Sequence, residues 1–193
     1  DVCSSDLQLF DLSYAINSTL SSQEKIKILS NALSYTLPDF DIHLIYNYRL
    51  SWAELSLLTN IAINYQSIDP NKSILYFSKI LDYCGLNSFD ICFTATFLSP
   101  VLTFFCTNLY IDKHFYKLLD LFSEKYFSAQ KKVLCNLGYF FFYYAQALGE
   151  VHNYTMVKCY GHYACAIQEL YETKPNSDVL KEYLLKDFDI TLV

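Results

Sequence analysis

The sequence predicts an all-α fold, and its composition gives the reasons. Among 193 residues only four are Gly and four are Pro. A β-sandwich or barrel needs a turn about every 8–12 residues, whereas long helices with short loops need far fewer turn residues. The chain is 53% hydrophobic and 18% aromatic, with 18 Tyr and 15 Phe. A disordered chain does not carry that much apolar surface, so a packed helical core is expected.

Helix start signals in the first half are explicit. Ser51-Trp52-Ala53-Glu54 has the spacing of a capping box, in which the Ser hydroxyl and the Glu carboxylate each pair with a free backbone N–H. It is predicted to open a helix that runs to about Ser67. Asp69-Pro70 is typical of an N-cap followed by Pro at the first helical position. Gly85 is placed to provide a left-handed C-terminal cap.

The same signals occur along the rest of the chain. Caps are expected at Ser21 or Ser22, Asn87 or Ser88, Asp112, Ser128, Asn153 and Ser177. The helices are expected over 22–36, 38–49, 88–109 with a kink at Pro100, 113–127, 129–149, 154–172 and a short final stretch after 177.

Helix openings recur in pairs at intervals of roughly 40 residues, which is typical of helical-repeat proteins. The best unit, 60–81, has small and aromatic residues where tetratricopeptide repeats have them. Small residues let paired helices approach closely, and aromatic rings fill the adjacent layer. The predicted architecture is therefore a right-handed superhelix of paired antiparallel helices of the tetratricopeptide type. The positions concerned are Ala62, Tyr65, Ser73 and Phe77, with Ile80 where the pattern prefers Ala.

Charge and cysteine usage limit the function classes. The net charge is −6 and Arg49 is the only arginine, so no basic patch is available for nucleic acid. The most apolar run, 91–106, is shorter than the roughly 20 residues of a membrane span. Seven cysteines in apolar helical stretches are expected to be free and buried, as in a reducing cytoplasm. The chain begins at Asp1 without a signal peptide or an initiator Met, so a preceding segment is expected.

From about Ser21 to its end the chain resembles the C-terminal domain of the Rgg/MutR family of Gram-positive transcription regulators. The residues that carry this resemblance are Leu50-Ser51-Trp52-Ala53-Glu54-Leu55-Ser56-Leu57-Leu58, followed by Asn60. The helix from Pro70 to Leu81 and the Tyr/Phe-rich stretch 133–148 fit the same layout.

The resemblance implies a peptide-sensing domain. Its concave face would bind a short imported signalling peptide, as in quorum sensing, and the domain would form a homodimer. It would normally follow a helix-turn-helix domain, which is missing from this sequence, so DNA would be bound only through that absent part. Residues 1–20 would then be a linker or helix, and 21–193 the cytoplasmic sensing and dimerisation domain. The sequence has no nucleophile elbow, Gly-rich phosphate loop or H-E-x-x-H motif, so no enzymatic activity and no cofactor are expected.

Candidate peptide-binding residues follow from helix spacing. Asn60 and Asn64 lie four residues apart and hence on one helix face. Side-chain amides and hydroxyls there can pair with the backbone of an extended peptide. The alternative, non-functional interpretation is that they face solvent or form hydrogen bonds with nearby backbone groups. The residues that would continue this wall on later helices are Thr103, Thr107, Asn136, Tyr139 and Tyr143.

Other interpretations stay open beside this one. The run Tyr139 to Tyr144 is expected mainly to pack in the core. Cys159, His162 and Cys165 carry ligand types that bind zinc, although their spacing is unusual for a zinc site, and no metal is predicted. The tail 188–193 is expected either to take part in dimerisation or to cap the last repeat. The alternative function is a free-standing tetratricopeptide-like scaffold for protein–protein interaction.

Overall fold

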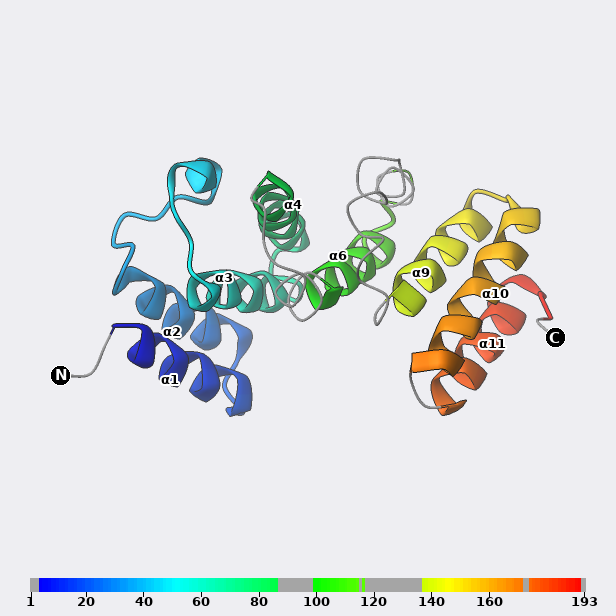
Figure 1. Cartoon of the computed structure of the whole chain (residues 1–193), viewed down its shortest axis with the longest axis horizontal. Helices are drawn as coiled ribbons and strands as arrows, with labels where there is room; N and C mark the ends of the chain where they lie inside the picture. The colour runs from blue at the N-terminus through cyan, green and yellow to red at the C-terminus, as the bar shows by residue number, and fades with distance from the viewer. Residues whose placement is uncertain (1–3, 87–98, 115, 117–136, 172–173, 192–193) are drawn as a thin grey trace. The chain divides into compact units, whose positions relative to one another are not determined.

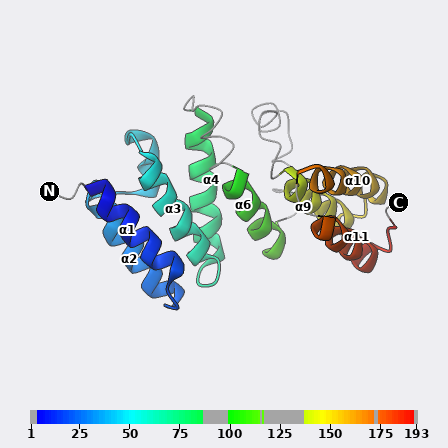
Figure 2. The same cartoon turned by 60° about the horizontal axis from the view of Figure 1, so that its bottom comes forward.

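The computed structural model describes residues 4–86, 99–114, 116, 137–171 and 174–191, and the regular structure in these ranges is helical, without strands. The all-α prediction is confirmed for this part of the chain (Figures 1 and 2). The contacts divide the chain into two compact units, Asp1–Ser88 and Phe89–Val193. The helices are α1 (Ser4–Asn17), α2 (Ser22–Ser34), the 3-10 helix η1 (Ile42–Asn47), α3 (Trp52–Tyr65), α4 (Pro70–Leu86), α6 (Ser99–Ile111), α9 (Leu137–Glu150), α10 (Tyr154–Tyr171) and α11 (Lys174–Phe188).

The first unit packs α1, α2 and α3 side by side, with α4 against α3 (Figure 1). The contacts at both ends of α2 and α3 fix their direction. The Ser67 hydroxyl donates to Ser22 Oγ at 3.0 Å, and the Thr36 hydroxyl donates to Glu54 Oε1 at 2.6 Å. The start of α2 therefore lies at the end of α3, so the two helices are antiparallel.

Capping boxes start both α2 and α3. The box at Ser51 confirms its prediction, and at α2, where a cap at Ser21 or Ser22 was expected, Ser21 is the cap. Ser21 Oγ accepts from the Glu24 N–H at 3.4 Å, and Ser51 Oγ accepts from the Glu54 N–H at 3.3 Å. The first box is exposed and the second is part of a buried polar chain. Gln8 Nε2 donates to Thr36 Oγ1 at 2.7 Å, and Glu54, only 5% exposed, accepts from Thr36 and from the Ser51 N–H. Glu54 thus connects α1, the end of α2 and the start of α3.

The predicted small-and-aromatic unit packs as its residue types require. Ala62, Ser73, Phe77 and Ile80 are fully buried. The Ser73 hydroxyl donates to the Ala62 carbonyl at 2.7 Å, a contact that only closely approaching helices can make. At the other end of the pair, the Tyr83 hydroxyl accepts from the Leu50 N–H at 2.9 Å, so α3 and α4 are also antiparallel.

The second unit packs α9 against α6 and α10, and α10 against α11. A Cβ on Gly138 would lie 2.8 Å from Gln168 Nε2. Helices α9 and α10 therefore approach each other closely at these two residues. The aromatic run on α9 is largely core, as expected: Phe141 and Phe142 are buried, and Tyr139, Tyr143 and Tyr144 are half-buried. The Phe141 ring stacks on Tyr160 at a centroid distance of 5.8 Å.

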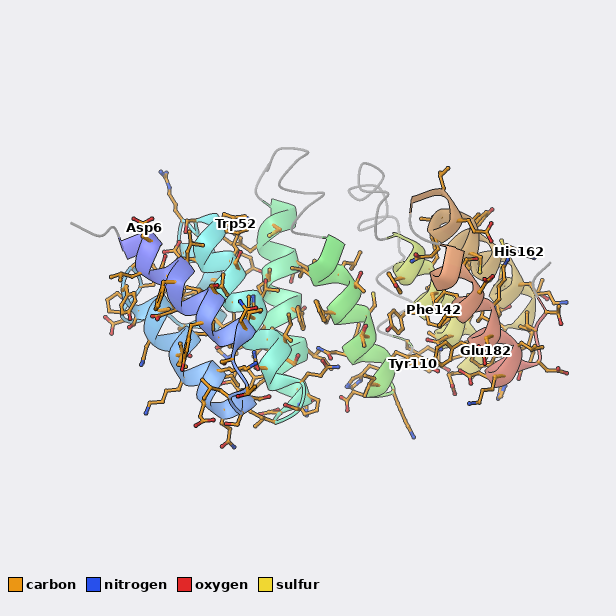
Figure 3. The ribbon with its side chains drawn as sticks, turned by 90° about the horizontal axis from the view of Figure 1, so that it is seen from below. Asp6, Trp52, Tyr110, Phe142, His162 and Glu182 are labelled. Atoms are coloured by element: carbon orange, nitrogen blue, oxygen red, sulfur yellow. The ribbon has the colours of Figure 1, made fainter. Side chains whose placement is uncertain are left out.

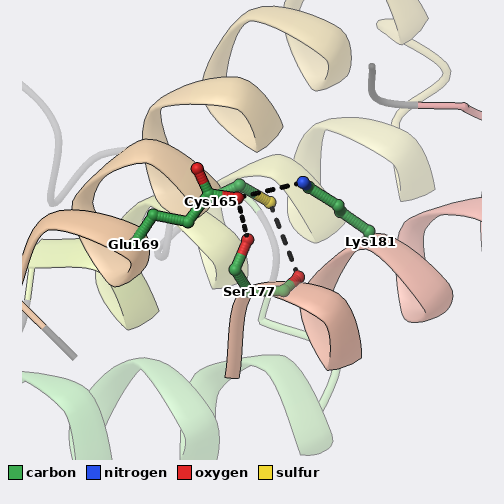
Figure 4. A network of polar contacts seen from close by, with 4 residues as sticks. All are labelled: Cys165, Glu169, Ser177 and Lys181. Carbon is green, nitrogen blue, oxygen red and sulfur yellow. Dashed lines mark hydrogen bonds and ion pairs between the residues drawn. The ribbon is translucent and has the colours of Figure 1, made fainter. Parts of the chain in front are cut away.

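A polar network joins α10 to the start of α11 (Figure 4). The Ser177 hydroxyl donates to Glu169 Oε1 at 2.8 Å, and Lys181 Nζ lies 3.0 Å from the same oxygen. The Cys165 thiol donates to the Ser177 carbonyl at 3.9 Å. Ser177 was predicted as the N-cap of this helix, and that prediction is wrong. The helix begins at Lys174, and the Ser177 hydroxyl bonds to α10 instead of to the start of its own helix.

Two other boundary predictions are corrected. Gly85 lies inside α4, and no described glycine has a positive φ, so it is not a left-handed cap. Among the described residues the left-handed caps are Lys113, His152 and Asp189. The paired bonds from 113 and 114 to 110 and 109, and from 152 and 153 to 149 and 148, close α6 and α9, and the bond from the Asp189 N–H to the Leu185 carbonyl closes α11. The helix expected over 38–49 is a shorter 3-10 helix, η1, capped by Asp41.

The predicted helix 113–127, the cap at Ser128 and the start at Asn87 or Ser88 lie outside the described residues, apart from 113, 114 and 116.

The expected starts at Asp69-Pro70 and Asn153 are confirmed. Asp69 Oδ1 accepts from the Lys72 N–H at 3.1 Å, and α4 begins at Pro70. α10 begins at Tyr154, and the Asn153 carbonyl accepts from the Val157 N–H. In the tail, Asp189 has a φ of 53°, and Ile190 is buried within its own unit. No helix within the described ranges has both the length and the apolar character needed to cross a membrane.

Gly149 lies inside α9 because the ring of Phe188 occupies the space of a side chain. A Cβ at this position would lie 2.6 Å from Cδ1 and Cζ of that ring. We expect Gly149→Ala to lower the free energy of unfolding by about 1–2 kcal/mol, since overpacking outweighs the gain of about 1 kcal/mol in helix propensity. Urea denaturation followed by far-UV circular dichroism measures this. Adding Phe188→Ala should make the Gly149→Ala change stabilising, and an equal loss in both backgrounds would contradict the steric explanation.

Candidate functional site

The predicted peptide-binding residues fall in both units. On α3, Asn60 and Asn64 are half-buried, and each donates its amide to its own helix. Asn60 Nδ2 bonds to the Ser56 carbonyl at 2.9 Å, and Asn64 Nδ2 bonds to the Asn60 carbonyl at 2.8 Å. These are the hydrogen bonds to nearby backbone groups that the non-functional interpretation predicts. Each amide uses one of its two N–H groups in this way, so its oxygen and its second N–H remain to face a ligand.

In the second unit, four predicted residues lie on two neighbouring helices. Thr103 and Thr107 are half-buried on α6, and Tyr139 and Tyr143 are half-buried on α9. The Thr107 hydroxyl donates to the Thr103 carbonyl at 2.8 Å. The seventh predicted residue, Asn136, lies outside the described residues.

Tyr110 at the end of α6 connects these two groups (Figure 3). It follows Thr103 and Thr107 at the spacing of one helix face. Its ring lies 6.1 Å from that of Tyr143, and its hydroxyl donates to Glu150 Oε1 at 3.4 Å. Tyr139, Tyr143, Gln146 and Glu150 likewise share one face of α9. We call this set the α6–α9 seam: Thr103, Thr107, Tyr110, Tyr139, Tyr143, Gln146 and Glu150.

Sequence reasoning missed Tyr110, Gln146 and Glu150. The signal that identifies them is present in the chain, because Tyr110 comes three residues after Thr107, and Gln146 and Glu150 come three and seven after Tyr143. Extending the i, i+3, i+4, i+7 pattern by one turn on each helix would have included them.

The seam has an electronegative end. Burial, together with the nearby carboxylates of Glu150 and Asp187, raises the pKa of the Tyr110 phenol to about 12. Both carboxylates favour the neutral phenol, which keeps its proton as a donor. Within the described ranges the Tyr143 hydroxyl has no hydrogen bond, so it is available to a ligand.

The four cysteines that the structure describes offer no comparable site. Cys84, Cys106 and Cys165 are free and buried, as predicted, whereas Cys159 is free and exposed. Burial raises the pKa of the Cys84 thiol to about 12 and that of Cys106 well above its usual value, so these thiols are poor nucleophiles. Cys165 points to Ser177 (Figure 4), while Cys159 and His162 are exposed. The described residues contain no group of three His, Cys, Asp or Glu side chains that could hold a metal ion.

Comparison with known proteins gives no match to this chain, either among protein-family models, among curated proteins or among solved structures. The functional argument therefore depends on the seam and on the residues that carry the sequence resemblance.

Proposed function

We propose that this chain is the ligand-binding domain of a bacterial transcription regulator and that it senses a short signalling peptide. The observation that carries the proposal is the α6–α9 seam, where half-buried hydroxyl and amide groups follow two neighbouring helices. An extended peptide has backbone N–H and C=O groups without partners of their own, and hydroxyl and amide side chains can pair with them. The resemblance of residues 50–60 to Rgg/MutR regulators supports the regulatory role.

The proposal includes the arrangement that this role requires. Paired antiparallel helices would continue as a right-handed tetratricopeptide-like superhelix with the peptide on its concave side. The domain would be cytoplasmic and homodimeric, and it would control a separate helix-turn-helix domain. Peptide binding would change gene expression only if the peptide favours one arrangement of the dimer over another. The domain itself would carry out no chemical reaction and need no cofactor.

Binding of a peptide at the seam is directly testable. The full chain is used to select from a random heptapeptide library, and the selected peptides are titrated by fluorescence anisotropy. Tyr143→Phe removes one hydroxyl and keeps the ring, so we expect about fivefold weaker binding, the effect of one lost hydrogen bond of about 1 kcal/mol.

Tyr163→Phe on α10 is the matched control because Tyr163 is exposed and outside the seam. It should leave the dissociation constant unchanged. A selection that yields no saturable binder, or equal affinity of the wild type and Tyr143→Phe, would refute peptide binding at this place.

A second candidate function, a protein–protein interaction scaffold, is favoured by one observation. Helix α1 exposes Leu7 (43%), Phe10 (70%) and Tyr14 (52%) at the spacing of one helix face. Phe10 and Tyr14 border a shallow hollow of about 280 Å³ on this helix, small for a ligand pocket but suited to an apolar contact. Isolated apolar side chains are common on surfaces, whereas a row on one helix indicates an interaction face. Sequencing the gene upstream of Asp1 distinguishes the two, since a helix-turn-helix there would support the regulator.

A further inference from the structure

The charges at the end of the seam indicate what kind of peptide it would take. Glu150 is exposed, and its Oε1 atom lies 3.4 Å from the Tyr110 hydroxyl oxygen. The negative charge of Asp187 on α11 also raises the pKa of that hydroxyl. In the described part of the chain, the ion pairs are Lys72 with Asp69, His114 with Asp112, and Lys181 with Glu169. The carboxylates of Glu150 and Asp187 are therefore not neutralised by a described cation.

A second, independent observation is the buried amide oxygen of Gln146. Its side chain is 5% exposed, and its Oε1 atom has no hydrogen-bond partner among the described residues. Gln146 shares the α9 face with Tyr143 and Glu150, three residues after the first and four before the second. A buried acceptor without a donor is unfavourable, and native proteins supply one in the great majority of cases. A ligand that donates several hydrogen bonds would satisfy it.

The two tyrosine rings complete the set. Tyr110 and Tyr143 lie 6.1 Å apart with their planes tilted by 46°. The face of such a ring attracts a cation through its quadrupole. Carboxylates, an amide oxygen and ring faces are all groups that receive a positively charged donor. An acidic ligand would be repelled by the same set.

We propose that the Tyr110, Gln146 and Glu150 end of the seam, with Asp187, binds the guanidinium group of an arginine in the ligand peptide. This deepens the proposed function, because it states which peptides the domain prefers. A guanidinium has five N–H donors in one plane and stacks on aromatic rings, so it matches separated acceptors better than the point charge of an ammonium group. The overall charge of −6 attracts the same class of ligand.

The test uses two blocked tripeptides that differ only in charge. Acetyl-Ala-Arg-Ala-amide and its citrulline counterpart are titrated into the full chain, and the side-chain amide of Gln146 is followed by NMR. The signal is assigned by its loss in Gln146→Met. We expect a saturable shift with the arginine peptide and at least tenfold weaker binding of the citrulline peptide, since charge-assisted hydrogen bonds are the stronger ones. Equal binding of the two tripeptides would overturn the proposal.

Paired variants separate site charge from overall charge. Glu150→Gln with Asp187→Asn should weaken binding of the arginine tripeptide about tenfold. Asp178→Asn with Glu182→Gln removes the same number of charges from exposed positions of α11 and should leave the affinity within about twofold. An equal loss in both variants would reduce the effect to net charge and refute a site. Thermal unfolding of each variant confirms that it folds.

The heptapeptide selection distinguishes this inference from the proposed function. Selected peptides that bind at Tyr143 without enrichment in arginine would leave the proposed function standing and refute the inference. Failure of every heptapeptide, together with saturable binding of the arginine tripeptide at Gln146, would support the guanidinium site and refute peptide sensing.

Discussion

Replacing Phe77 by Ala is expected to cost the first unit about 3–5 kcal/mol of unfolding free energy. The Phe77 ring is fully buried on α4, one turn after Ser73, whose hydroxyl holds the close approach to α3. Because that hydrogen bond fixes the distance between the helices, the cavity cannot close by moving α4 toward α3. A loss of this size is comparable to the whole stability of many small domains.

The single tryptophan makes the measurement specific. Trp52 begins α3 in the first unit, so its fluorescence in a urea titration reports that unit, while circular dichroism reports both. Phe10→Ala is the matched control, since Phe10 is 70% exposed on α1, and it should shift stability by less than about 0.5 kcal/mol. An unchanged fluorescence midpoint in Phe77→Ala would show that this ring does not hold α3 and α4 together.

Replacing Glu54 by Ala is expected to cost about 3 kcal/mol. Its carboxylate is 5% exposed and accepts from the Thr36 hydroxyl and the Ser51 N–H, both at 2.6 Å. Removing it leaves both donors without their acceptor at the junction of α1, α2 and α3. Glu54→Gln keeps the shape and one acceptor, so it should lose about 1 kcal/mol. Trp52 fluorescence in a urea titration again measures the unfolding of the first unit.

The chain carries its own control for this prediction. Glu24 forms the same capping box with Ser21 at the start of α2, but in full contact with solvent. Glu24→Ala removes the same interaction without exposing buried partners, and it should destabilise much less than Glu54→Ala. Similar losses from the two variants would mean that burial of Glu54 adds nothing beyond the cap.

Sequence reasoning identified four of the seven residues of the α6–α9 seam and missed the other three. Thr103, Thr107, Tyr139 and Tyr143 were found because hydroxyl groups at helical spacing are visible in the chain. Glu150 lies one residue beyond the predicted helix 129–149 and was missed, since nothing local shows that Tyr110, 40 residues earlier, bonds to it. The predictions at Asn60 and Asn64 have the opposite problem: the face is correct, but their amide donors turn back to their own helix.

What the sequence determined by itself is the helical character of the described chain and the starts of α2, α3, α4 and α10. Capping boxes, the Asp69-Pro70 pair and the position of Asn153 act within one turn of backbone, so their effect does not depend on the rest of the molecule. Tertiary structure decided where several helices end and which polar groups meet. Gly149 leaves space for the ring of Phe188 instead of forming a turn. The Ser177 hydroxyl bonds to Glu169 rather than to its own helix, and the Glu54 carboxylate accepts a hydrogen bond from Thr36. Each of these outcomes depends on a partner from another helix, and helix spacing alone cannot specify that partner.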